Sequence, residues 1–552
     1  MSAVNERYGD MRGKVTISGA TLRFARFAGV RALGVVIIVI GLSGLSRAVF
    51  AAPPALTTDA ESAAPSAAAP AVLTTVVIGG STIFSPPQLF AAYRDQLGAL
   101  PSGETARAIA DALSDMYVRD GYVKPELTLD ETLASRGVLR LQVYEAQITH
   151  VIYEGDGGKF DDALARLGTR LENARPLRTD DVQQALRAMR QIAGLAVTAT
   201  TRRDPEVRNA FDLLVRTDYS PVDGVVRMNN RGTDQVGPAF VLGQLFANGL
   251  FGHQEKIGLI YAAATDPDEY LGGGLYVDTA FGNDGARGNA LLFRSHSAPH
   301  EQTVDLDDEY TRERLTFRFT KPFQQRSDLS LSGSLGFEAD DLVIERADNI
   351  IRDDRLRILE AILRTNWLAG ATRLSANLQL RHGLDAFGSG LDASDLANDP
   401  RRADFIVTLM QASAYRRFAD RWSLRLDMFS QISGYVLPDS ERFKIGGDRL
   451  GRGFEVAEIA GDSGVGGKLE LRRDLMNTDT FIGRLSAYGF YDVGAAWKQD
   501  LPGRESAATA GTGFALQGAA LTGYLEVAAP LTGTDIEGKQ RASVFAELSY
   551  RF

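Results

Sequence analysis

The stretch that decides the fold is Arg484-Leu-Ser-Ala-Tyr-Gly-Phe-Tyr-Asp-Val-Gly-Ala-Ala-Trp497. Successive side chains of a strand point to opposite faces, so this stretch has one face of small and apolar residues and one polar face. The first face carries Leu485, Ala487, Gly489, Tyr491, Val493, Ala495 and Trp497, and the second includes Arg484, Ser486, Tyr488 and Asp492. Such alternation over about ten residues is typical of a membrane strand with lipid outside and a polar lumen inside. A soluble β-sandwich would alternate in the same way.

The region from Val222 to the C-terminus repeats this pattern. Its last strand alternates Val544, Ala546, Leu548, Tyr550 and Phe552 with polar residues, and many strands carry aromatic residues near their ends, as interface girdles require. A sandwich of this length would need a domain break, whereas membrane strands of about 9–11 residues with their connections fill the region roughly sixteen times. We therefore predict a transmembrane antiparallel β-barrel of about 16 strands over residues 221–552.

Two similar units precede the predicted barrel. The first, residues 73–146, begins with an apolar strand that ends at Gly80, and the second, residues 147–220, begins with a strand that ends near Gly155. In each unit two helices follow, the first unit's opening at Ser85-Pro86 and running to about Leu97, and then two strands. A β-α-α-β-β order thus occurs twice, with a period of about 75 residues. We predict two small α+β domains, each exposing a sheet edge that can accept an extended peptide or serve only as a spacer.

The N-terminus has the features of a targeting segment. Six basic residues precede an apolar run that begins at Ala32, and small residues around Ala51 suit cleavage. The apolar run is shorter than the roughly 20 residues that a membrane span needs, so we favour a signal peptide over residues 1–51 to an uncleaved anchor. Residues 52–72 are rich in Ala and Pro and are predicted to be a flexible linker.

Composition and motif searches argue against catalysis. The 552 residues contain no cysteine, and a formal charge of −10 gives no cationic field for nucleic acid. Only His296 and His300 among the five histidines are close in sequence, and their Ser-Ala-Pro context favours a loop over a metal site. The stretch 461–468 lacks the spacing of a phosphate loop and is interpreted as a turn and strand start. We expect no enzyme activity, no metal and no cofactor.

The informative cluster is Ile445-Gly-Gly-Asp-Arg-Leu-Gly-Arg-Gly-Phe454. Arg452, Gly453 and Phe454 resemble the Arg-Gly-Phe/Tyr motif of the outer-membrane insertase and secretion-pore superfamily, which lies on a sixth extracellular loop folded back into the barrel. Tyr491-Asp492-Val493-Gly494 resembles the next signature of that superfamily, and the resemblance implies that Asp492 points into the lumen and pairs with Arg452. An arginine away from bulk water needs a carboxylate in any case. The superfamily usually has an aliphatic residue before the arginine, and this chain has Gly451.

The whole mature chain resembles a known arrangement. The tandem units look like polypeptide-transport-associated (POTRA) domains, and two of them before a barrel is the order found in two-partner secretion (type Vb) transporters, the haemolysin-activator and filamentous-haemagglutinin transporter group. The ending Tyr550-Arg-Phe552 looks like the recognition signal of outer-membrane barrels. The resemblance implies an outer-membrane location with the POTRA-like domains in the periplasm.

The implied function is the transport of a partner protein. The resemblance implies contacts with outer-membrane lipid, with the barrel assembly machinery during biogenesis, and with a large secreted exoprotein of haemolysin, adhesin or haemagglutinin type, bound through the POTRA-like domains and passed unfolded to the cell surface. The alternative is an insertase of the same superfamily, which usually carries three or more such domains. Helix-plugged relatives exist, but residues 52–72 show no amphipathic period.

Overall fold

The computed structural model describes residues 71–552 except 234–235, 283, 300–307, 327, 395–397, 479–482 and 534–540. The predicted signal peptide, residues 1–51, and all but the last two residues of the predicted linker lie outside the described residues. Among the residues described, no helix is both long and apolar enough to cross a membrane.

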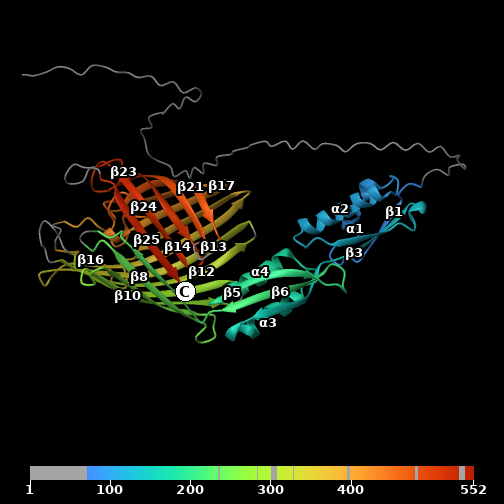
Figure 1. The fold of residues 1–552 in the computed structure, drawn as a ribbon, viewed down its shortest axis with the longest axis horizontal. Helices are drawn as coiled ribbons and strands as arrows, with labels where there is room; N and C mark the ends of the chain where they lie inside the picture. Colours follow the sequence, from blue (N-terminus) through green and yellow to red (C-terminus); the bar gives the residue numbers. More distant parts are fainter. Residues whose placement is uncertain are drawn as a thin grey trace, which may run out of the picture. The chain divides into compact units, whose positions relative to one another are not determined.

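The first α+β domain is a three-stranded sheet with helices on it (Figure 1). Its elements are β1 (Thr75–Gly79), α1 (Pro86–Phe90), η1 (Arg94–Gln96), α2 (Gly103–Arg119), β2 (Glu126–Asp130), η2 (Ala134–Arg136) and β3 (Val138–Tyr144). The sheet order is β1-β3-β2, with β1 parallel to β3 and β2 antiparallel to it. Ile109, Leu113 and Leu139 are fully buried between α2 and the sheet. The helix predicted to reach about Leu97 is wrong in length, because α1 ends at Phe90 and only the short η1 follows.

The second α+β domain repeats this plan with the order β4-β6-β5. Its elements are β4 (Gln147–Gly155), η3 (Gly158–Phe160), α3 (Asp161–Glu172), α4 (Thr179–Arg190), β5 (Leu195–Arg203) and β6 (Ala210–Tyr219). Again the first strand runs parallel to the central one and the other edge strand is antiparallel. Met189, Leu213 and Val215 lie in its core. The domain boundaries expected at 146/147 and 220/221 fall between β3 and β4 and between β6 and β7, and their placement stays a prediction.

Glycines mark equivalent positions in the two domains. Gly80 and Gly155 end the first strand of each, with φ values of +82° and +100°. A Cβ atom on Gly80 would lie 2.2 Å from the Val143 carbonyl oxygen, and one on Gly155 would lie 2.1 Å from that of Thr217. Both chain reversals therefore require glycine, for its backbone freedom and for its lack of a side chain.

The remaining strands close into an antiparallel barrel of sixteen long strands (Figure 1). In chain order they are β7 (Val222–Asn229), β8 (Phe240–Asn248), β9 (Lys256–Ala264), β10 (Tyr270–Phe281), β11 (Ala286–Ser297), β12 (Asp308–Gln325), β13 (Leu329–Arg346), β14 (Asn349–Ala369), β15 (Thr372–Gly383), β17 (Ile406–Ala419), β18 (Trp422–Ser433), β21 (Ser463–Asn477), β22 (Arg484–Trp497), β23 (Glu505–Gln517), β24 (Leu521–Pro530) and β25 (Ser543–Arg551). The short β16 (Gly390–Ala393) pairs with the end of β14 beyond β15. The predicted fold class is confirmed.

The barrel has two different ends. The connections between strands alternate between the two ends. One end has short turns, for example 249–255, 370–371 and 420–421. The other end has the long connections 384–405 and 434–462. We name these ends the short-turn end and the long-loop end. The chain enters the barrel at the short-turn end, where β7 begins.

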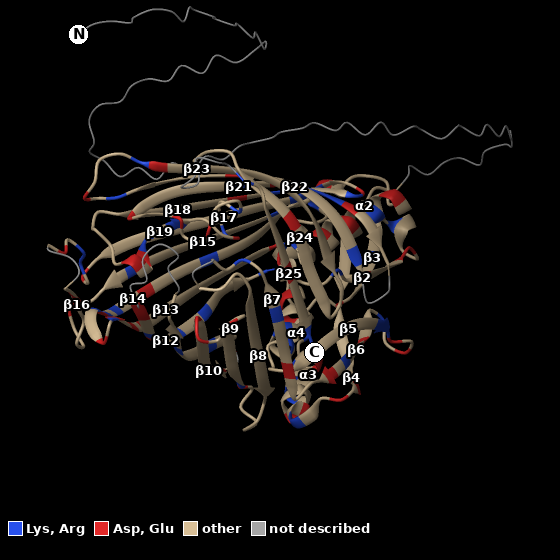
Figure 2. Ribbon diagram, turned by 60° about the vertical axis from the view of Figure 1, so that its left-hand side comes forward, with Lys and Arg blue, Asp and Glu red and all other residues tan. Residues whose placement is uncertain are grey.

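The outer face of the barrel is apolar and the inner face is polar. Outward side chains on strand after strand are between 44% and 68% exposed, among them Leu259, Leu275, Leu335, Met428, Tyr491 and Leu548. Their neighbours on the inner face include the buried carboxylates of Asp340, Glu360 and Asp492. Figure 2 shows long stretches of β8, β9 and β22 without charged residues. This is the division that a strand between lipid and an aqueous lumen requires, and a sandwich core would reverse it.

We predict that Gly80→Ala destabilises the first domain more than Gly98→Ala does. Both glycines have positive φ, so each alanine costs about 1–2 kcal/mol, but nothing lies within 4 Å of a Cβ on Gly98. Thermal unfolding followed by the helical circular dichroism signal measures the effect, because α1–α4 all lie in the two α+β domains. Equal melting temperatures for the two variants would contradict the steric account.

Candidate functional site

Loop 6, residues 434–462, connects β18 to β21 and packs inside the barrel. It contains η4 (Asp439–Glu441) and a small hairpin of β19 (Phe443–Ile445) and β20 (Ile459–Gly461). Its apolar side chains form one buried cluster with the inner faces of the neighbouring strands: Phe443, Ile445, Leu450 and Phe454 from the loop, and Phe429, Ala496 and Ala507 from the wall. This cluster explains why a long connection folds inward.

Arg452 lies at the tip of loop 6 and is bound to Asp492 on β22. Its Nε and Nη2 atoms donate to the two carboxylate oxygens of Asp492 at 3.0 and 2.9 Å. The backbone N–H groups of Gly451 and Arg452 donate to the same carboxylate at 3.3 and 3.2 Å. Asp492 is fully buried and Arg452 is 6% exposed. A two-pronged charged pair with added backbone bonds fixes both the position and the orientation of the loop tip.

Two further carboxylates and an aromatic ring surround the same guanidinium. Arg452 Nη1 donates to Glu526 on β24 at 3.1 Å and to Glu470 on β21 at 3.3 Å. Its Cζ atom lies 3.4 Å from the centre of the Phe490 ring. We name Arg452, Asp492, Glu526 and Glu470 the Arg452 cluster. Three strands, β21, β22 and β24, are thus joined to one loop residue.

The neighbours of Arg452 explain the motif. Gly451 has φ of +83°, and a Cβ there would lie 2.8 Å from Ile445, so the glycine that departs from the usual superfamily pattern is required by this turn. A Cβ on Gly453 would lie 2.8–2.9 Å from Thr509, Ala529 and Pro530, so the loop backbone touches the wall there. Phe454 is 7% exposed in the apolar cluster.

The other side of loop 6 is bound to a second part of the wall, β14 and β15. Glu441 accepts from Arg381 on β15 at 2.8 and 3.0 Å, and Asp439 accepts from Arg352 on β14 at 2.8 Å. Arg381 also contacts Glu360 at 3.1 Å and Glu338 at 3.3 Å. From β14 round to β24 the loop is therefore attached across half of the sixteen strands.

Side chains of the barrel wall line two cavities. One of about 690 Å³ opens at the short-turn end and is lined by arginines of several strands, by Trp367 and by Glu470 of the Arg452 cluster. The other, of about 1040 Å³, lies between loop 6 and the wall formed by β9–β13, with Val456 and Lys444 on its loop side.

The predicted C-terminal residues lie where the barrel closes. Phe552 exchanges backbone hydrogen bonds with Gly224 at 3.0 and 3.1 Å, and Tyr550 is paired in register with Val226. Their rings stack with centroids 6.1 Å apart and are about half exposed on the outer face. The terminus therefore presents two aromatic rings outward at the short-turn end.

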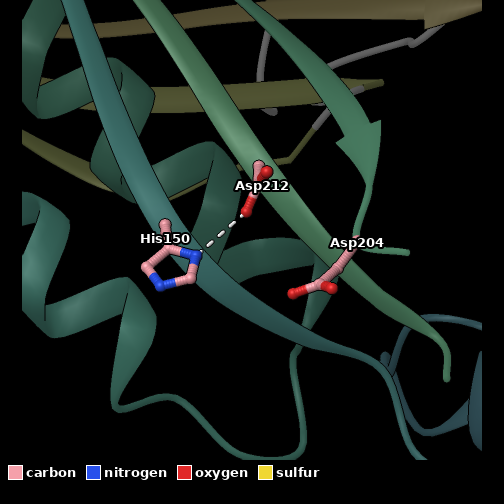
Figure 3. A group of neighbouring side chains, drawn as sticks. All are labelled: His150, Asp204 and Asp212. Atoms are coloured by element: carbon pink, nitrogen blue, oxygen red, sulfur yellow. Dashed lines mark hydrogen bonds and ion pairs between the residues drawn. The ribbon is translucent and has the colours of Figure 1, made fainter. Parts of the chain in front are cut away.

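The group around His150 is held together by ion pairs and hydrogen bonds within the protein. His150 Nδ1 lies 3.1 Å from Asp212, which also accepts from Arg202 at 2.8 Å, and Asp204 lies nearby (Figure 3). Asp204 accepts the backbone N–H groups of Glu206 and Val207, as a turn residue does. Because Arg202 already neutralises Asp212, the group is an ion-pair network rather than a cation site. His296 lies in β11 and not in the loop that its context predicted; His300 is outside the described residues.

Sequence reasoning missed Glu470 and Glu526 in the Arg452 cluster, and Arg381 and Glu441 at the other attachment. None of the four lies in a recognisable motif. Lumen-facing charge in an alternating strand was the available signal, since a charge inside a barrel needs an opposite one.

Comparison with known proteins agrees with this fold. A family model described as haemolysin secretion/activation protein ShlB/FhaC/HecB matches residues 213–518, more than half of the chain. The outer membrane transporter CdiB of Dickeya dadantii (strain 3937) is 22% identical over 380 residues, 65% of this chain and 64% of that protein's length. CdiB from Escherichia coli has a TM-score of 0.71 at 18% identity, and CdiB from Acinetobacter baumannii one of 0.62 at 12%, each over 87% of this chain and 90% of theirs.

A sixteen-stranded barrel with an inward loop held at an arginine, preceded by two POTRA-like α+β domains, defines an outer-membrane transporter of the insertase and secretion-pore superfamily. Within that superfamily, the chain belongs to the ShlB/FhaC/HecB family of haemolysin secretion/activation proteins, the two-partner secretion transporters. The predicted family is confirmed.

We predict that the second α+β domain loses stability in acid because the carboxylate of Asp212 becomes protonated. Hydrogen bonds from Arg202 and His150 hold the pKa of Asp212 below its usual value. Its contribution is therefore present above the pKa of the unfolded chain and is lost as pH falls through the lower, folded pKa. The melting temperature of the helical signal should differ between wild type and Asp212→Asn at neutral pH and converge in acid.

The matched control is Asp218→Asn, which removes an exposed carboxylate from the same strand, β6. It should leave the acid-dependent part of the melting curve as in wild type. A difference between wild type and Asp212→Asn that is constant with pH would contradict the assignment.

Proposed function

We propose that this chain binds a large exoprotein partner at its two POTRA-like domains and passes it, unfolded, through the barrel to the cell surface. In this arrangement the domains and the short-turn end face the periplasm, and the long-loop end faces outward. The apolar outer face contacts outer-membrane lipid, and Tyr550 and Phe552 serve as the signal for the barrel assembly machinery. Folding of the partner outside would give direction without a nucleotide.

The observation that carries the proposal is a lumen occupied by loop 6 and held there through buried charges. A passive porin needs an open aqueous channel, and the attachment of this loop at β14–β15 and at β21–β24 would oppose that. A pore that passes an extended polypeptide only occasionally needs instead a lumen that is closed at rest and opens when the polypeptide arrives. We propose that Arg452 and Asp492, with Gly453 and Phe454, hold loop 6 in its working position.

The edge of the second domain offers a place for the partner. The sheet order β4-β6-β5 leaves β4 and β5 at its edges. On β4 the N–H of Val151 already donates to Glu172 at 2.8 Å, which obstructs strand addition there. On β5, Ser220 N–H donates to Gly194 across the ladder, so the alternation of antiparallel bonds turns the N–H groups of Val197, Ala199 and Thr201 away from β6. The carbonyl oxygen of Val197 already accepts from Arg190 Nε at 3.3 Å. We infer that an extended partner segment adds along β5 at Ala199 and Thr201.

We predict that Arg452→Ala lowers secretion of the partner by about tenfold or more while the barrel remains inserted. Removing the cation leaves the carboxylates of Asp492 and Glu526 buried without it, which destabilises the docked loop by about 3–5 kcal/mol. The measurement is the amount of exoprotein in the medium when the variant is co-expressed with an exoprotein from its genomic neighbourhood. Heat-dependent mobility on gels monitors the folded barrel.

Arg449→Ala is the matched control, since Arg449 is an exposed arginine of the same loop that lies over the Phe429 ring at 5.2 Å. Its secretion should stay near the wild-type amount. Normal secretion by Arg452→Ala would refute the role of the cluster. Accumulation of other outer-membrane proteins in the periplasm, with secretion intact, would indicate an insertase instead.

We predict that Ala199→Pro weakens binding of the partner's N-terminal fragment by about threefold to tenfold, the value of one lost hydrogen bond. Proline removes the outward N–H and leaves the bonds between β5 and β6 in place. Ala199→Val keeps the N–H and suits a strand, so it should bind as wild type does. Titration of the full chain in detergent with the labelled fragment measures both; equal affinities would exclude strand addition at this position.

A further inference from the structure

Glu526 on β24 lies between two arginines. One carboxylate oxygen accepts from Arg452 Nη1 at 3.1 Å and the other from Arg231 Nη2 at 2.6 Å. Tyr488 O–H also donates to it at 2.9 Å. Glu526 is 2% exposed, so its charge depends on these partners and not on water. One buried carboxylate therefore connects loop 6 to a residue that the motif does not include.

Arg231 comes from the other end of the barrel sequence. It follows β7 by two residues, and its side chain is 9% exposed. Its Nε donates to Tyr524 at 2.7 Å, its guanidinium lies 4.1 Å from the centre of the Phe545 ring, and its Nη1 lies 3.5 Å from the carbonyl oxygen of Arg452. Arg231 thus contacts loop 6 both directly and through Glu526.

The same segment forms the closing seam, the pairing of β7 with β25. It has only five register pairs, from Val225–Arg551 to Asn229–Glu547, whereas the other neighbouring long strands have eight or more. The seam continues through the Asn230 side chain, which accepts from Ala546 N–H at 2.7 Å and donates to the Val544 carbonyl at 3.0 Å. Arg231 is the next residue. The residue that makes the last bonds of the seam, Asn230, is therefore adjacent in the chain to a residue that contacts the Arg452 cluster.

We propose that Arg231 and Glu526 are positioning residues that make docking of loop 6 and closure of the β7–β25 seam depend on each other. With loop 6 docked, Arg231 is held at Glu526 and at the loop backbone, and this holds Asn230 in the seam. When the loop leaves, Arg231 loses its contact with the loop. When the seam opens, Arg231 moves away and Glu526 neutralises Arg452 alone. As a statement about transport, this rests on the proposed function.

Amide hydrogen exchange of the full chain in detergent tests the coupling at both ends without any partner. The bonded pair Gly224–Phe552 and the alternation of the ladder place the N–H groups of Leu548, Tyr550 and Phe552 across the seam. At the loop tip, the N–H groups of Gly451 and Arg452 donate to Asp492. Peptides covering 543–552 and 446–455 therefore report the seam and the loop separately.

We expect Arg231→Gln to raise exchange at the loop tip, and Arg452→Ala to raise exchange at the seam, each by about fivefold or more. Because the two residues act through one coupled contact, the double variant should exchange little faster at each place than the more affected single variant does there. Glu526→Gln should affect both peptides. Peptides from β10 and β11, the fourth and fifth barrel strands from the seam, should stay at wild-type rates and so exclude general unfolding.

Arg227→Gln is the matched control, because Arg227 also lies on β7 and its ion pair with Glu547 on β25 is long, at 3.7 Å, and half exposed on the arginine side, so its loss should weaken the seam little. It should leave the loop tip unchanged. The coupling is refuted by unchanged seam exchange in Arg452→Ala, by additive effects in the double variant, or by equal effects of Arg227→Gln and Arg231→Gln. If Arg231→Gln does not fold, the seam measurement in Arg452→Ala still decides. A failure of secretion in every background would instead refute the proposed function and leave this result standing.

Discussion

The structure depends on a cation held away from bulk water. Arg452 cannot give up its proton, so inside the barrel its charge must be met by carboxylates at fixed distances. Asp492 meets it at two atoms and Glu526 and Glu470 at a third. Each carboxylate comes from a different strand, so the loop tip can bind as it does only when β21, β22 and β24 have these relative positions. The Phe490 ring against the guanidinium excludes water from one side and strengthens that binding.

Asp492 can meet Arg452 in this way because each barrel strand has one face toward lipid and the other toward the lumen. Tyr491 points outward and is 44% exposed, while Asp492, the next residue, is fully buried on the inner face. A helix could not place adjacent residues in lipid and in a polar interior so regularly. The polar face of the wall must in turn be satisfied internally, and the carboxylates of Glu338, Glu360 and Asp340 have arginine partners on neighbouring strands. Loop 6 is attached to this existing charge pattern at both of its sides.

Much of this was predictable, and the unpredicted part has a physical reason. Alternation predicted the barrel, and the repeat predicted the two α+β domains, because both patterns are local. The resemblance placed Arg452 and Asp492 together. Glu526 and Arg231 were missed, since they are 74 and 221 residues from Arg452 and meet it only through strand register and barrel closure. Gly451 looked like a departure from the motif, whereas its positive φ shows the turn that the tip requires.

The proposed transport needs loop 6 to leave its docked position, and the surroundings of Arg452 affect how easily it can do so. On one side the guanidinium is covered by Phe490, and the loop backbone touches the wall at Gly453. On the other side Glu470 also lines the cavity that opens at the short-turn end, so water reaches the edge of the cluster. Charges at such a boundary attract each other less than in a dry core and are rehydrated more easily when they separate. The docked loop is therefore held by interactions that are specific in geometry yet moderate in free energy, as the proposed passage of a polypeptide requires.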